Sequence, residues 1–106
     1  MNKRFYERVH TSLDVKLICD KKVHSGVVTN ISRNGMCINS NLPNPSEMKS
    51  CEVMIHWHKE VMKVPVKVLR VTRSDSSSEG MGVELIQSPK KYLEFVDTLH
   101  FFYSLA

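Results

Sequence analysis

Apolar and polar residues alternate with a period of two along most of the chain, in short runs that end at turn-forming residues. Leu13, Val15 and Leu17, for example, are separated by Asp14 and Lys16. Alternation of this kind predicts strands with one buried side and one side facing solvent. It predicts six strands, at residues 11–19, 23–30, 36–40, 50–58, 61–73 and 81–86.

Turn signals separate these runs. Residues 20–22 and 58–60 are polar, and the Asn34-Gly35 pair is a strong hairpin signal. Two prolines mark residues 41–49 as a loop, and residues 74–80 form a Ser-rich loop. Pro65 interrupts the fifth run and predicts an edge strand or a bend there.

The C-terminal segment has a different period. Ser88 and Pro89 are suited to the start of a helix, and Leu93, Val96 and Leu99 recur at helical spacing. The pattern predicts an amphipathic helix over residues 89–104. The aromatic residues of this segment are expected to serve helix packing and not a base-stacking platform, with any exposed remainder suited to a partner interface: Tyr92, Phe95, Phe101, Phe102 and Tyr103.

Six short strands followed by one helix predict an all-β fold, a small antiparallel six-stranded β-barrel whose C-terminal helix covers one mouth. With 106 residues, the chain suits a single domain. We expect residues 1–10 to form a flexible N-terminal arm, residues 11–87 the barrel and residues 88–104 the helix.

Two short motifs contain the candidate binding residues. Arg4 and Arg8 form an R-x-x-x-R motif, and Asn30, Ser32 and Gly35 form an N-x-S-x-x-G motif. Each motif by itself is common. In this order and separation, in a chain of strands followed by a helix, they resemble the PilZ family of cyclic di-GMP receptors. The resemblance extends from residue 3 to the C-terminal helix.

The resemblance implies that these five residues bind cyclic di-GMP, and their chemistry suits that ligand. The planar fork of arginine bonds phosphate and the guanine edge, and stacks on bases. Asn30 can meet a guanine edge with its amide, and Ser32 can bond base or phosphate. Gly35 has no Cβ, so its backbone can approach a flat ring or adopt a positive φ.

Two further basic residues are candidates for the same site. Arg33 lies inside the second motif, where it can reach a phosphate or face solvent. Lys3 stands where many PilZ members have arginine. In PilZ-like proteins, a basic residue at this position often accompanies the binding of two stacked ligands. Lysine keeps the charge without the fork, so the resemblance leaves open whether one or two ligands bind.

The remaining features bound the class of protein. The net charge of +4 fits a phosphate-bearing partner. The polar, basic start argues against a secretory signal and no apolar run is long enough to span a membrane, so a cytoplasmic protein is expected. The three cysteines, an odd number without close spacing, indicate reduced thiols. No catalytic, metal or cofactor signature is present, so no enzyme activity, metal site or cofactor is expected.

Two alternatives to the receptor hypothesis remain. The first is a nucleic-acid-binding small barrel, which the basic balance suggests, but the aromatic residues gather in the helix instead of alternating along strands. The second is a PilZ-like protein-interaction module that binds no nucleotide, against which the intact motifs argue. For a receptor, we expect an unidentified downstream effector protein as partner, no nucleic acid, and a monomer or weak dimer.

Overall fold

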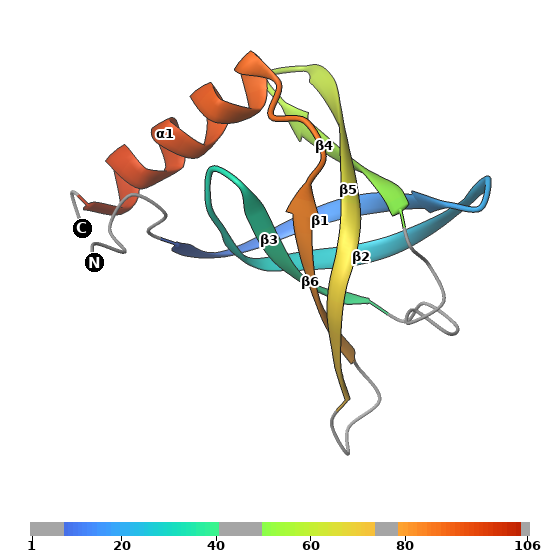
Figure 1. Ribbon diagram of the computed structural model, residues 1–106. Helices are drawn as coiled ribbons and strands as arrows, with labels where there is room; N and C mark the ends of the chain where they lie inside the picture. Colours follow the sequence, from blue (N-terminus) through green and yellow to red (C-terminus); the bar gives the residue numbers. More distant parts are fainter. Residues whose placement is uncertain (1–7, 41–49, 74–78, 105–106) are drawn as a thin grey trace.

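The strands pair into one closed barrel in the order β1-β2-β3-β6-β5-β4, every neighbouring pair antiparallel (Figure 1). The structure is a computed structural model that describes residues 8–40, 50–73 and 79–104. Its elements are β1 (Val9–Cys19), β2 (Lys22–Ile31), β3 (Gly35–Ser40), β4 (Ser50–Trp57), β5 (Glu60–Arg73), β6 (Glu79–Leu85) and α1 (Lys90–Ser104). The predicted barrel with a C-terminal helix is confirmed. β1 begins at Val9 and not at residue 11, because buried Val9 pairs with Ile31 of β2.

In the alternating runs, the apolar side chains face the inside of the barrel and the polar ones face solvent. The inward-facing residues are largely aliphatic, and several are wholly inaccessible to solvent: Leu17, Val28, Ile31, Ile38, Val53, Ile55, Val64 and Val66. Burial of this apolar surface is the main stabilising contribution to such a domain.

Two of the predicted turns are two-residue hairpin connections. Asp20 and Lys21 join β1 to β2, and His58 and Lys59 join β4 to β5. All four residues have positive φ, between 53° and 66°. Positive φ at both central positions is the backbone of a type I′ turn, whose twist matches that of the paired strands.

Pro65 does not mark an edge strand, so that interpretation is wrong. β5 pairs with β4 on one side and with β6 on the other. The proline is tolerated because it lies where the β6 ladder ends. Pairing with β6 starts at Val66 and Leu85, and the carbonyl oxygen of Pro65 accepts the last bond from the Ile86 amide at 2.9 Å.

The expectation of reduced thiols is wrong for two of the three cysteines. Cys19 and Cys51 form a disulfide, with Cα atoms 4.7 Å apart, and Cys37 remains free. The bridge lies next to the β1–β4 junction, the pairing that closes the barrel, which has only three Cα partner pairs. The cysteines are 32 residues apart, so barrel closure brings them together and no local spacing predicts the bond.

Helix α1 lies across one end of the barrel, above the turn between β2 and β3 (Figure 1). Tyr92, Phe95 and Val96 are buried against the barrel, and the Phe95 ring meets Trp57 edge-on with centroids 5.2 Å apart. Phe101 and Phe102 instead form the exposed remainder of these aromatic residues, at 59% and 60% exposed. Both lie in the second half of the helix, C-terminal to the buried residues Tyr92, Phe95 and Val96.

Candidate nucleotide-binding site

A β-bulge at Thr29 directs the Asn30 side chain outward. Val28 pairs with Ile38 of β3, but the next pairing is Asn30 with Cys37, so Thr29 is the extra residue. Strict alternation from buried Val28 would place Asn30 inside the barrel and Ile31 outside. The bulge reverses this order, and Ile31 is wholly buried. The sequence signal for it, apolar Val28 and Ile31 three positions apart, was missed.

The structure brings the two motifs together at this point. The Arg8 guanidinium donates a hydrogen bond from Nη1 to Asn30 Oδ1 at 2.6 Å. The same nitrogen lies 3.7 Å from the Cys37 sulfur, across the Asn30–Cys37 pair. Arg8 precedes β1 and Asn30 is near the end of β2, where β1 and β2 run side by side. A guanidinium and an amide therefore lie next to each other on the outer surface of the barrel.

Ser32 lies inside the turn and not on its surface. It is only 1% exposed, and its hydroxyl donates to Asn34 Oδ1 at 3.0 Å. Its amide closes the turn by donating to the Gly35 carbonyl oxygen at 2.9 Å. In this conformation the Ser32 side chain shapes loop 32–34, the connection between β2 and β3.

Gly35 is required by β6 rather than by a turn angle. Its φ is not positive, so the expectation of a positive φ at this glycine is wrong. A Cβ at this position would lie 2.7 Å from the Val83 carbonyl oxygen, far inside van der Waals contact. The absence of a side chain therefore lets β3 and β6 approach closely directly beside loop 32–34.

We expect Gly35→Ala to lower the free energy of unfolding by about 1–3 kcal/mol, because the new methyl group meets backbone that must shift. Gly26→Ala is the matched comparison. Its Cβ would first meet a side-chain methyl of Ile38 at 3.0 Å, which can move more easily than backbone. Urea unfolding of both variants measures the difference. An equal or smaller loss for Gly35→Ala would contradict this role.

Helix α1 holds the loop from the other side. The Arg33 guanidinium forms an ion pair with Asp97 at 2.6 Å, so Arg33 contacts the helix in this structure. The Tyr92 hydroxyl, buried below the loop, donates to the Ser32 carbonyl oxygen at 2.6 Å. Burial raises the pKa of Tyr92, while the positive charge of nearby Arg8 acts in the opposite direction. The phenol is therefore a neutral donor at physiological pH.

A hollow of about 170 Å³ adjoins Arg8 on the barrel surface. It is lined by Arg8, Met36, Leu69, Gly82 and Val83, and Leu69 is 59% exposed. Leu69 is the extra residue of a second bulge, between the Val68–Val83 and Arg70–Gly82 pairs. Sequence reasoning missed Leu69, Gly82 and Cys37 as neighbours of the site. Their proximity depends on the β3–β6–β5 pairing order, which the sequence does not show.

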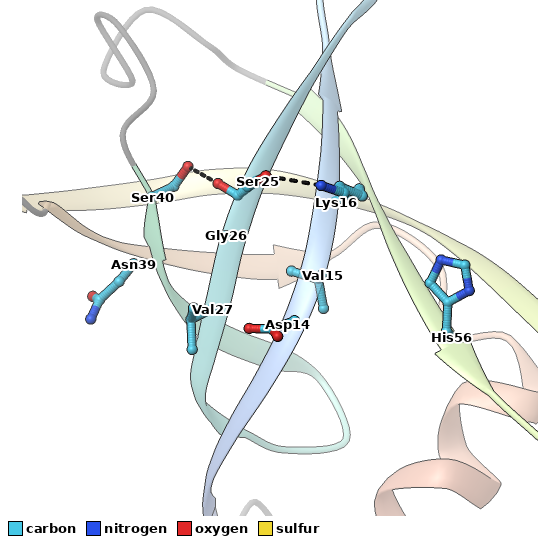
Figure 2. Close-up of a pocket in the computed structure, with 9 residues that line it drawn as sticks. All are labelled: Asp14, Val15, Lys16, Ser25, Gly26, Val27, Asn39, Ser40 and His56. Carbon is cyan, nitrogen blue, oxygen red and sulfur yellow. Dashed lines mark hydrogen bonds between the residues drawn. The ribbon is translucent and has the colours of Figure 1, made fainter.

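A larger hollow, of about 560 Å³, lies on the outer face of β1 to β4 (Figure 2). Its polar lining consists of Asp14, Lys16, Ser25, Asn39, Ser40 and His56, and the Lys16 ammonium bonds the Ser25 hydroxyl at 2.9 Å. Of the described residues, it is lined by none of the motif residues Arg8, Asn30, Ser32 and Gly35. Its size therefore does not make it the better candidate, because the paired guanidinium and amide lie elsewhere.

Lys3 and Arg4 lie outside the described residues. Among residues 8–40, 50–73 and 79–104, no cluster of three or more His, Cys, Asp or Glu side chains is arranged to hold a metal ion. Within the same ranges, no helix has the length and apolar character needed to span a membrane.

Comparison with known proteins identifies a family. The family model for the PilZ domain matches residues 2–97. No curated protein sequence matches the chain. Solved structures at low sequence identity share the fold, among them three described next.

The first is the Bacillus subtilis inhibitor of motility, MotI/DgrA, with a TM-score of 0.76, 17% identity, and coverage of 99% of this chain and 53% of that chain. The PilZ domain of Escherichia coli YcgR with c-di-GMP has a TM-score of 0.71 and 10% identity, with coverage of 94% of this chain and 90% of that chain. Borreliella burgdorferi PlzA in complex with c-di-GMP has a TM-score of 0.67 and 13% identity, with coverage of 92% of this chain and 51% of that chain. The chain thus spans about half the length of MotI/DgrA and of PlzA.

Proposed function

Because this chain belongs to the PilZ domain family, we propose that it is a cyclic di-GMP receptor, and the contact between Arg8 and Asn30 is the observation that most supports this function. A guanidinium 2.6 Å from an amide, on an exposed surface, presents donors for phosphate and polar groups for a guanine edge. Two of the fold relatives, YcgR and PlzA, were solved with c-di-GMP.

The size of the neighbouring hollow supports a site completed by the N-terminal arm. At about 170 Å³, it is smaller than the roughly 300–1,000 Å³ of ordinary small-molecule pockets. This hollow by itself can therefore seat only part of a cyclic dinucleotide, such as one base against Leu69 and Gly82. We assign the remaining contacts to Arg4, with Lys3 as a further cation. The arm closes over the ligand on binding.

Within this site, the other motif residues have different roles. Ser32 and Gly35 build the loop and the strand contact that hold Asn30 in place. Arg33, paired with Asp97, contributes to the positive potential and is not a primary ligand contact. Arm closure creates a new surface, which a downstream effector protein reads, and the domain signals without catalysing a reaction.

Calorimetric titration with cyclic di-GMP tests the proposed function directly. We expect saturable heat with cyclic di-GMP, and none with GTP or with single-stranded DNA at the same salt concentration. The stoichiometry reports whether one or two ligands bind. Tighter binding to the oligonucleotide would instead favour a nucleic-acid-binding barrel, and binding of neither would favour a protein-interaction module.

A further inference from the structure

Tyr92 connects helix α1 to the backbone of the proposed ligand loop. The residue is 0% exposed and lies 60 positions from Ser32 in the sequence. Its ring is part of the hydrophobic core, while its hydroxyl donates a hydrogen bond to the Ser32 carbonyl oxygen at 2.6 Å. A core residue of the helix therefore has its only polar group aimed at the loop two residues after Asn30.

Loop 32–34 has further anchors. The amide of Ser32 donates to the Gly35 carbonyl oxygen at 2.9 Å, and Leu85 of β6 donates its amide to the Asn34 carbonyl oxygen at 3.0 Å. The Arg33–Asp97 ion pair is exposed on both sides, and such pairs contribute little. The Tyr92 bond is buried, where losing a donor leaves a carbonyl without a partner. The Tyr92 bond therefore stabilises the loop conformation more than the Arg33–Asp97 ion pair does.

We propose that Tyr92 is a positioning residue of the cyclic di-GMP site. By bonding the Ser32 carbonyl, it holds the backbone that directs Asn30 toward Arg8, and it couples the site to the docking of α1. This inference rests on the proposed receptor function. The coupling is reciprocal: if docked α1 strengthens ligand binding by some factor, bound ligand strengthens helix docking by the same factor.

The test is Tyr92→Phe, which removes one oxygen and keeps the ring. We expect calorimetry to show about three- to ten-fold weaker binding of cyclic di-GMP, the range of one hydrogen bond. The matched control is Val53→Ala, a wholly buried barrel-core position on β4, a strand that pairs with neither β2 nor β3. It should lose at least as much thermal stability and bind as the unmodified protein does. The positioning role would be overturned if affinity fell in proportion to thermal stability in both variants, or if Tyr92→Phe left the affinity unchanged.

Amide hydrogen exchange supplies a readout that needs no ligand. In ligand-free protein, Tyr92→Phe should increase exchange of the Ser32 amide about three- to ten-fold, and Val53→Ala should not. In the unmodified protein, cyclic di-GMP should slow exchange in α1, and Tyr92→Phe should reduce that effect. If the unmodified protein does not bind cyclic di-GMP, the receptor function fails. If it binds, but α1 exchange responds equally in both proteins, only the coupling through Tyr92 fails.

Discussion

Replacement of Arg8 by alanine should weaken cyclic di-GMP binding about ten- to a hundred-fold. Hydrogen bonds to charged groups contribute about 1.5–3 kcal/mol, and each 1.4 kcal/mol is a factor of ten in affinity. The melting temperature should stay nearly unchanged, because the Arg8–Asn30 bond is exposed and both groups can be hydrated without it. Calorimetry and thermal unfolding at one salt concentration measure both quantities, since phosphate contacts weaken as salt rises.

Three further variants separate a specific contact from general charge. Arg4→Ala should lose affinity as Arg8→Ala does, although Arg4 lies outside the described residues. Arg33→Ala also removes one positive charge, but Arg33 is paired with Asp97. This variant should therefore lose much less affinity for cyclic di-GMP than Arg8→Ala does. Arg8→Lys should recover only part of the affinity, because the ammonium lacks the planar fork. If Arg8→Ala binds as well as the unmodified protein, the assignment of the site to Arg8 and Asn30 is wrong.

Reduction of the Cys19–Cys51 disulfide should lower the free energy of unfolding by about 3–4 kcal/mol, from the chain-entropy cost of a loop closed over 32 residues. That is a large part of the roughly 5–15 kcal/mol typical of a domain. The loss should be concentrated at the β1–β4 junction, where only three Cα partner pairs close the barrel. Urea unfolding with and without a phosphine reductant measures it.

Two variants make the result specific to this bond. A Cys19→Ala/Cys51→Ala double variant should be destabilised and no longer respond to the reductant. Cys37→Ala should respond as the unmodified protein does, because Cys37 is free. Three titratable thiols in the unfolded, unreduced protein, together with unfolding that the reductant does not change, would show that the bond does not form in solution.

Much of the fold could be predicted from local patterns. Alternation along residues such as Leu13, Val15 and Leu17 predicts the strands, because a strand turns successive side chains to opposite faces. The polar stretches at residues 20–22 and 58–60 predict turns, because polar residues favour solvent-exposed connections. The structure makes them two-residue hairpins at Asp20-Lys21 and His58-Lys59. The family motifs were also recognisable, because they are read as residue types at set spacings.

The geometry of the site was only partly predictable. The motifs predicted that Arg8 and Asn30 belong to one site, and the structure places them 2.6 Å apart. The same motif suggested ligand contacts for Ser32 and Gly35. The structure shows Ser32 inside its own loop and Gly35 against the backbone of Val83. A motif specifies which residue types are needed, but not which neighbours they meet.

What the sequence by itself determined are the properties that depend on near neighbours: the strands, the hairpins, the amphipathic helix and the two motifs. Only the tertiary structure decided which strands are adjacent. The pairing of β5 with β4 and with β6 rules out the edge that Pro65 suggested, and the β1–β4 pairing brings Cys19 to Cys51. The β2–β3 pairing makes Thr29 a bulge and directs Asn30 outward. These features depend on contacts between distant residues, whose formation reflects the packing of the whole barrel and not the preference of any one segment.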